Sequence, residues 1–119
     1  MSNRRLLIAE DSELAASALR LLFEESGFDV AVATSVQSVI DIGTSWHPHV
    51  MLLDITLSDG DGLTALRSLN ESGNAPSLTI ALTGHDDDDL RQRCMDAGCA
   101  EVLLKPAPIA RLLELARSL

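Results

Sequence analysis

The chain has 119 residues, a length that fits one globular domain with a single hydrophobic core. Its 18 acidic and 9 basic residues give a net charge of -9, which repels phosphodiester backbones and argues against direct nucleic-acid binding. Its apolar runs are too short to cross a bilayer and no secretory signal precedes them, so we expect a cytoplasmic protein with no membrane contact.

The first half of the sequence alternates apolar runs of strand length with segments of helical period. Residues 6–9 predict a strand, and residues 14–22 carry apolar side chains at helical spacing, with Gly27 ending that helix. A second strand follows at 30–33, and a second helix begins at Val36 and is expected to end at Gly43. Residues 50–53 are apolar at every position, which is typical of a strand covered on both faces of a parallel sheet.

The second half repeats the same alternation. A third helix is expected at 63–69 and ends near Gly73, and a fourth strand follows at 78–82. Residues 90–97 predict a fourth helix capped by Gly98, residues 102–104 a short fifth strand, and residues 109–116 a last helix. Strict alternation requires right-handed crossovers, so we predict an α/β fold with a five-stranded parallel sheet and helices on both faces.

The polar residues that follow the strands are the most informative feature of the sequence. Glu10 and Asp11 follow the first strand, Asp54 the third, Thr83 the fourth and Lys105 the fifth. An open parallel sheet binds its ligands beyond the carboxyl ends of its strands, so we expect these side chains to line one pocket.

Three carboxylates in one pocket repel each other unless positive charge balances them. All the available ligands are oxygens, which favours Mg2+ as the occupant, and Lys105 supplies a second positive charge. The Thr83 hydroxyl can donate to a phosphoryl oxygen, and Asp54 can act as a nucleophile toward phosphorus. The pattern therefore indicates phosphoryl transfer to Asp54.

The whole chain resembles the response-regulator receiver domain of two-component signalling. The resemblance rests on the acidic pair, on Leu52-Leu53-Asp54, on Thr83 and on Lys105-Pro106, which occur in that family's order and spacing. It implies a flavodoxin-like, doubly wound (βα)5 fold with strand order 2-1-3-4-5, spanning residues 1–119 as one receiver domain. The resemblance further implies that the protein is a signalling phosphoacceptor and not a conventional enzyme, one that catalyses its own phosphorylation and dephosphorylation.

The resemblance also assigns roles to single residues. It implies that Asp54 is phosphorylated, that Asp11 binds Mg2+ directly, that Glu10 acts mostly through water, and that the Thr56 carbonyl completes the metal shell. It further implies a cis bond between Lys105 and Pro106, and a Thr83 side chain that reorients on phosphorylation. The implied phosphodonor is a histidine kinase or histidine phosphotransfer protein, and an output partner, a fused output domain or a homodimer remain open.

The sequence departs from the family pattern at two places. Val102 stands three residues before Lys105, where the family commonly has Tyr or Phe, so an inward-turning ring cannot carry the signal. In the segment after the acceptor, Ser58 and Gly60 replace residues that are often Pro and Met, so we expect a looser loop.

Three other functions fit parts of this pattern. A flavodoxin-like nucleotide or flavin binder needs amide donors after the first strand, where Glu10 and Asp11 would repel phosphate. A phosphohydrolase of the haloacid dehalogenase type needs a second aspartate at the position of Thr56. The alternative that stays open is a phosphorylation-independent, receiver-like protein interaction module.

The remaining polar features have simpler interpretations. The acidic run at 86–89 lacks the glycine and distal glutamate of a calcium loop and reads as an exposed helix start. His47 and His49 are expected at the surface, at the opposite end of the sheet from the pocket, together with Trp46. Cys94 and Cys99 are too few for a four-ligand zinc site and are interpreted as small, reduced core residues.

Overall fold

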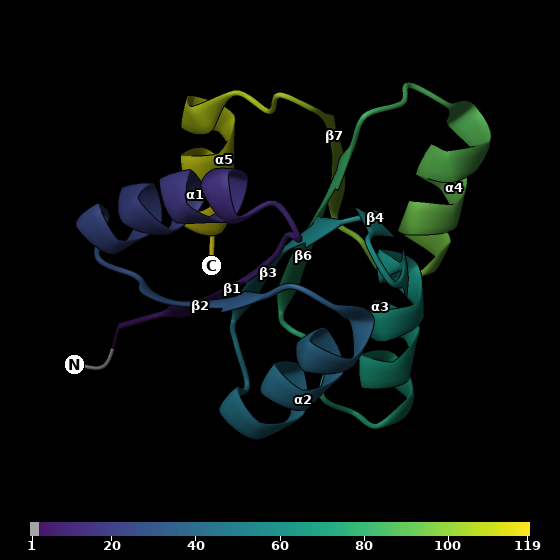
Figure 1. The fold of residues 1–119 in the computed structure, drawn as a ribbon, viewed down its shortest axis with the longest axis horizontal. Coiled ribbons are helices and arrows are strands. Elements are labelled where there is room, and N and C mark those ends of the chain that lie inside the picture. Colours follow the sequence, from purple (N-terminus) through teal and green to yellow (C-terminus); the bar gives the residue numbers. More distant parts are fainter. Residues whose placement is uncertain (1–2) are drawn as a thin grey trace.

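The computed structural model describes residues 3–119, so residues 1 and 2 of the predicted domain lie outside the described part. Five parallel strands form its main sheet, in the order β2-β1-β3-β6-β7 (Figure 1). These strands are β1 (Arg5–Ala9), β2 (Asp29–Ala33), β3 (Val50–Asp54), β6 (Leu78–Thr83) and β7 (Glu101–Leu104). Counted along this sheet alone, the order is 2-1-3-4-5, which confirms the predicted fold class.

Five helices cover the two faces of the sheet. They are α1 (Glu13–Glu25), α2 (Val36–Trp46), α3 (Gly62–Glu71), α4 (Asp88–Asp96) and α5 (Ile109–Ala116). Helices α1 and α5 pack on one face, where Phe23 and Leu112 are fully buried, and α2, α3 and α4 pack on the other. Within residues 3–119, no helix has both the length and the apolar character that a bilayer crossing requires.

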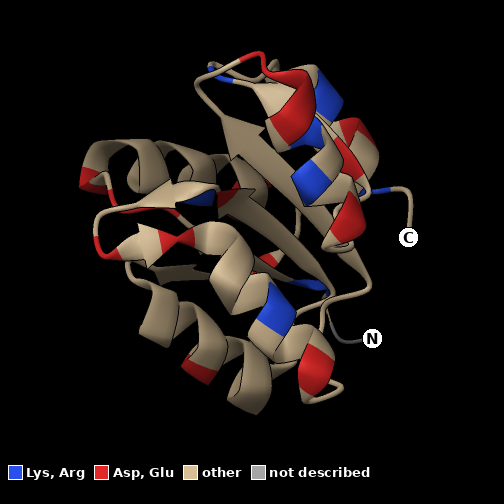
Figure 2. Cartoon of the chain, turned by 90° about the vertical axis from the view of Figure 1, so that its right-hand side faces the viewer, with Lys and Arg blue, Asp and Glu red and all other residues tan. Residues whose placement is uncertain are grey.

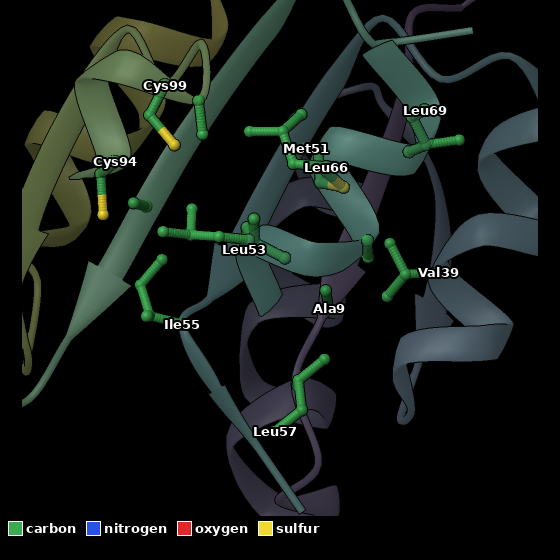
Figure 3. Packing of buried hydrophobic residues seen from close by; sticks show 14 of the residues in the cluster. Ala9, Val39, Met51, Leu53, Ile55, Leu57, Leu66, Leu69, Cys94 and Cys99 are labelled. Carbon is green, nitrogen blue, oxygen red and sulfur yellow. The ribbon is translucent and has the colours of Figure 1, made fainter. Parts of the chain in front are cut away.

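Strand β3 lies in the centre of the sheet and is buried along its whole length, as its unbroken apolar run predicts. Met51 and Leu53 point to the face covered by α2, α3 and α4, where Leu66 and Leu69 of α3 pack against them (Figure 3). Leu52 lies in the cluster on the opposite face. Alternation along β3 therefore anchors both layers and fixes the position of Asp54 at its carboxyl end.

The prediction that Gly43 ends the second helix is wrong, because α2 continues to Trp46. Gly43 is buried inside the helix, and a Cβ there would lie 2.8 Å from the Cδ atoms of Leu69 on α3. This glycine therefore permits close contact between two helices. The helix ends instead at His47, which adopts the left-handed conformation immediately before Pro48.

The segment after Asp54, for which the sequence predicts a looser loop, forms a short antiparallel hairpin of β4 (Thr56–Leu57) and β5 (Gly60–Asp61). Leu57 is buried, and the Asp59 carboxylate accepts hydrogen bonds from the Val36 amide at the start of α2. The hairpin is thus attached both to the core and to a neighbouring helix.

The acidic run at 86–89 begins α4, as predicted: Asp87 is its N-cap and accepts from the amides of Asp89 and Leu90. Within α4, two acidic residues are followed by Arg91 and Arg93 and then by Asp96, so the helix surface carries charges of both signs (Figure 2). Arg93 pairs with Asp61, the N-cap of α3, at 2.9 Å. Helices α3 and α4 are therefore linked at the surface beside the hairpin.

Candidate functional site

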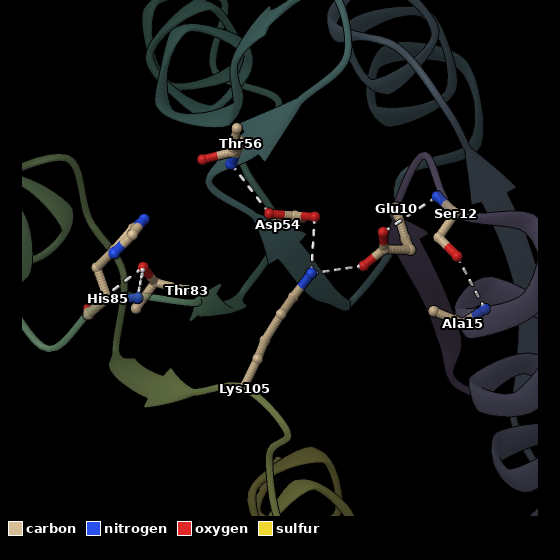
Figure 4. A network of polar contacts seen from close by, with 8 residues as sticks. All are labelled: Glu10, Ser12, Ala15, Asp54, Thr56, Thr83, His85 and Lys105. Carbon is tan, nitrogen blue, oxygen red and sulfur yellow. Dashed lines mark hydrogen bonds and ion pairs between the residues drawn. The ribbon is translucent and has the colours of Figure 1, made fainter.

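The carboxyl ends of four strands bring the predicted polar residues to one edge of the sheet. Carboxylate oxygens of Glu10, Asp11 and Asp54 all lie within 4.8 Å of one another. The side chain of Lys105 enters this group from the end of β7 (Figure 4). Four of the expected site residues are thus adjacent, although they come from three separate strand ends.

Lys105 connects two of the acids directly. Its Nζ donates to Asp54 Oδ2 at 2.8 Å and to Glu10 Oε2 at 2.9 Å. Burial lowers the pKa of Lys105, but the hydrogen bonds and charges of Asp54 and Glu10 raise it by more, so the net pKa lies above that of an ordinary lysine. The ammonium group is therefore held charged between the two carboxylates.

Asp54 is 6% exposed and its carboxylate is held from two sides. The Thr56 amide donates to Oδ1 at 2.9 Å while Lys105 occupies Oδ2. Gly62, the first residue of α3, passes so close that its amide donates to the Ile55 carbonyl at 2.7 Å. The absence of a side chain at position 62 leaves room for the backbone of Asp54, a requirement that inspection of the sequence missed.

Glu10 is more buried than its predicted role through water requires. Its side chain is 5% exposed, and its second oxygen, Oε1, accepts from the Ser12 amide at 3.1 Å. Ser12 is in turn the N-cap of α1, with its hydroxyl accepting from Ala15. Glu10 thus links the start of α1 to Lys105, a positioning contact that the sequence pattern did not reveal.

Thr83 is buried near this group, but its hydroxyl contacts the following loop (Figure 4). Its Oγ1 accepts from the His85 amide at 3.1 Å and donates to the His85 carbonyl at 3.4 Å. The Thr83 carbonyl accepts from the Lys105 amide at 2.7 Å. Thr83 is therefore coupled to Lys105 through the backbone and to His85 through its side chain.

The donor atoms present suit a hard divalent cation. The three acids offer only oxygen ligands, and Lys105 supplies a single positive charge against three carboxylates. Mg2+ is bound in proteins by one or two carboxylates together with water and phosphate oxygens. The residues at this edge of the sheet therefore fit the magnesium ion that the sequence predicts.

An apolar hollow of about 360 Å³ opens beside this acidic group. Glu10 and Lys105 form its polar side, and Leu19, Leu82 and Leu112 are among its apolar lining residues. Its wall comes from α1, from the end of β6 and from the segment that leads into α5. The Lys105–Pro106 bond at its rim is cis, as the resemblance implies.

Val102, which replaces the expected aromatic residue, is 4% exposed and packs within the core cluster of α2, α3 and α4. A guanidinium nitrogen of Arg91 on α4 donates to the Val102 carbonyl at 3.1 Å. The same side chain lies 3.9 Å from the Asp86 carboxylate in the loop after Thr83. An arginine thus connects that loop to β7 near the position where the family commonly has a ring.

The sequence predicts that His49 is a surface residue, and the structure corrects this. It is half-buried, and its Nδ1 accepts from the Arg5 amide at 2.9 Å, whereas His47 is exposed. The expectation failed because the contact joins residues 44 positions apart. Both histidines nevertheless lie at the amino-terminal edge of the sheet, away from Asp54, as predicted.

Comparison with known proteins agrees with this architecture. A sequence profile described as the response regulator receiver domain matches residues 6–117. The chain is 28% identical over 116 residues to the polar-differentiation response regulator DivK of Brucella ovis, covering 97% of this chain and 94% of that protein. It is 32% identical over 103 residues to a protein-glutamate methylesterase/protein-glutamine glutaminase of Rhodopseudomonas palustris, covering 86% of this chain but only 28% of the longer protein.

A solved structure, the BeF3-activated N-terminal receiver domain of RstA from Klebsiella pneumoniae, superposes with a TM-score of 0.85 at 25% identity. The alignment covers 96% of each chain. The profile match spans nearly all of the chain, and the sheet order agrees with it. The chain therefore belongs to the response regulator receiver domain family of two-component systems.

Proposed function

We propose that this receiver domain accepts a phosphoryl group on Asp54 in a Mg2+-dependent reaction. The observation that carries the proposal is the Lys105 ammonium group, which lies between Asp54 and Glu10 within a group of three carboxylates. A buried carboxylate with an adjacent fixed cation is suited to hold a phosphoryl group, because the cation already provides positive charge to balance the negative charge that the phosphoryl group brings.

The proposed reaction transfers the phosphoryl group to a carboxylate oxygen. A carboxylate oxygen of Asp54 attacks phosphorus, a P–O bond forms, and the P–N bond of a phosphohistidine breaks. The electron pair leaves with the imidazole, which takes up a proton. Lys105 is close enough to donate to an oxygen of the transferred group, and this interaction would accelerate both phosphorylation and the later attack of water that releases inorganic phosphate and restores the Asp54 carboxylate.

Asp11, Asp54 and the Thr56 carbonyl would hold the magnesium ion, with Glu10 contributing through water. When bound, Mg2+ supplies positive charge that offsets the phosphoryl oxygens. The Glu10 contact with Lys105 supports a second role, because it orients the ammonium group toward Asp54.

The proposed donor is a histidine kinase or a histidine phosphotransfer protein. The hollow beside Lys105 supports this partner, because its apolar lining can receive an apolar side chain next to the phosphohistidine. The output partner would meet α4, β7 and α5, where Met95, Leu104 and Ile109 are exposed. This partner can be a separate protein, a fused output domain or a second copy of the chain.

Switching would begin at Thr83. Its hydroxyl would leave His85 and donate to the phosphoryl group, which frees the His85 amide and shifts the loop that contains Asp86. Arg91 connects Asp86 to the Val102 carbonyl, so movement of this loop would reach β7 without an aromatic ring.

The test is incubation with acetyl phosphate and Mg2+ followed by intact-mass measurement. One added phosphoryl group is expected, and it should disappear in Asp54→Asn and on chelation of Mg2+. Asp59→Asn is the matched control, because Asp59 lies in the adjacent hairpin and, among residues 3–119, its carboxylate bonds only to the Val36 amide. Absence of an adduct with acetyl phosphate and with phosphorylated donor proteins would favour the interaction module instead.

A further inference from the structure

A second hollow, of about 290 Å³, lies at the amino-terminal edge of the sheet. It is formed by Arg5 at the start of β1, by His47 and His49 between α2 and β3, and by Asn74 and Ser77 between α3 and β6. Asp54 follows the opposite, carboxyl end of β3. This hollow is therefore separate from the acidic group described above, and nothing in the proposed phosphorylation uses it.

The charge of this hollow is opposite to that of the chain. Acidic residues outnumber basic ones by 18 to 9 in the sequence, yet no Asp or Glu lines it. No carboxylate of residues 3–119 lies within 4.0 Å of the Arg5 guanidinium. A permanently charged group thus faces a polar hollow without a counter-ion from the described chain.

The Arg5 side chain is held in place by two hydrogen bonds and keeps N–H donors that no acceptor within residues 3–119 occupies. Its Nε and one Nη2 hydrogen donate to the His47 carbonyl, at 3.2 and 2.9 Å. A guanidinium has five N–H donors, so three have no acceptor in the described part of the chain. His47 has φ 52° and stands before Pro48, a conformation that needs such support from its surroundings. The contact therefore fixes the guanidinium at the rim of the hollow.

His49 is oriented by the same strand. The Arg5 amide donates to Nδ1, so the neutral ring carries its proton on Nε2, and the His49 amide donates back to the Arg5 carbonyl at 2.9 Å. This pair leaves Nε2–H as a donor on a ring that already lines the hollow. The exposed Ser77 hydroxyl is a further donor from the neighbouring loop.

We propose that this hollow is a binding site for a small oxyanion, a compound that bears a phosphate or carboxylate group. Arg5 is the charged anchor, since the guanidinium fork matches the oxygens of both groups, and His49 and Ser77 add neutral donors. The volume lies at the lower end of the range for small-molecule sites, so the ligand is a small compound and not a polymer.

Asp29 provides an independent check on the electrostatic argument. It is the register partner of Arg5 on β2, and its carboxylate accepts from Asn3 at 3.2 Å without reaching the guanidinium. Its negative charge opposes an anion bound at Arg5. Asp29→Asn keeps an oxygen for Asn3 and removes that charge, so it should strengthen binding several-fold.

The experiment titrates the full chain, without Mg2+, with inorganic phosphate and separately with succinate at constant ionic strength. Backbone and imidazole NMR signals of Arg5, His49 and Ser77 should shift and saturate. Arg5→Gln should weaken binding about tenfold or more, as expected for loss of a charge-assisted hydrogen bond. Arg67→Gln removes the same charge from an exposed position outside the hollow and should leave the affinity for phosphate and succinate unchanged.

The outcomes separate the possible sources of the anion. Saturation by phosphate alone assigns a phosphate ester, saturation by succinate alone assigns a carboxylate, and saturation by both supports the general oxyanion. The proposal is overturned if neither saturates, or if Arg5→Gln and Arg67→Gln bind equally well. Should Arg5→Gln fail to fold, Asp29→Asn decides, because unchanged or weaker binding in that variant contradicts an anion at Arg5.

Discussion

A Cβ atom at position 62 would lie 2.3 Å from the backbone carbonyl oxygen of Asp54. Gly62 therefore packs directly against the residue at the centre of the acidic group. The obstacle is backbone, which cannot swing aside as the end of a side chain can. Substitution of Gly62 therefore tests how tightly the start of α3 packs against Asp54.

Gly62→Ala should lower the free energy of unfolding by about 1 to 3 kcal/mol, the usual cost of forcing atoms into a packed interior. Urea denaturation measures the change. Gly84→Ala is the control, because a Cβ at position 84 meets no heavy atom within 4 Å, and it should stay within about 0.5 kcal/mol of the parent. Equal stability of the two variants would contradict the packing described for Gly62.

Gly43→Ala should cost less than Gly62→Ala, although Gly43 also lies in a tight contact. The atoms in its way are the terminal carbons of Leu69, which can rotate. Alanine also favours the helix interior by about 1 kcal/mol over glycine, which offsets part of the strain. The same urea experiment ranks the two variants, and a larger loss at position 43 would contradict this order.

Lys105→Met should reveal how the lysine contributes to stability at alkaline pH. The folded-state pKa of Lys105 is raised, so the folded protein holds this proton more tightly than the unfolded chain does. That contribution is complete below about pH 10.4, the ordinary lysine pKa, and disappears as the pH rises through the higher folded value. The difference in unfolding free energy between parent and variant should therefore be constant from about pH 8 to 9.5 and should shrink above about pH 10.4. A difference that grows with pH would contradict the raised pKa.

The Cys99 thiol should react slowly with iodoacetamide in the folded protein. Burial raises its pKa to about 12, and the neighbouring Cys94 adds to the rise, so almost no thiolate exists at pH 8. Cys94→Ala leaves Cys99 as the single thiol, and its labelling can be followed by mass spectrometry with and without denaturing urea. Rapid labelling without urea would show that the end of α4 opens readily.

Trp46, the single tryptophan, should respond weakly to Mg2+. It is the last residue of α2 and packs against the core at the amino-terminal edge of the sheet, whereas the three carboxylates lie at the opposite edge. A fluorescence titration with Mg2+ is expected to produce little change in emission. Strong quenching would place a cation close to the indole and contradict the proposed metal position.

The sequence by itself determined the five strands of the main sheet, the fold class and the edge of the sheet that carries the acids. Apolar runs and helix-ending residues such as Gly27 and Gly98 are local signals, and parallel strands bring residues after their carboxyl ends together wherever the helices pack. Asp54 and Lys105 were predictable as neighbours for that reason.

Only the tertiary structure decided which atoms pair. The bridge from Lys105 to Glu10, the Thr83 contact with His85 and the Arg5 contact with His49 depend on side-chain rotamers and loop paths that no periodicity encodes. Gly43 is a further example. The sequence does not distinguish a glycine that ends a helix from one inside a helix that leaves room for Leu69 of a neighbouring helix. Local propensity acts over a few residues, whereas these contacts join segments that meet only after the sheet has assembled.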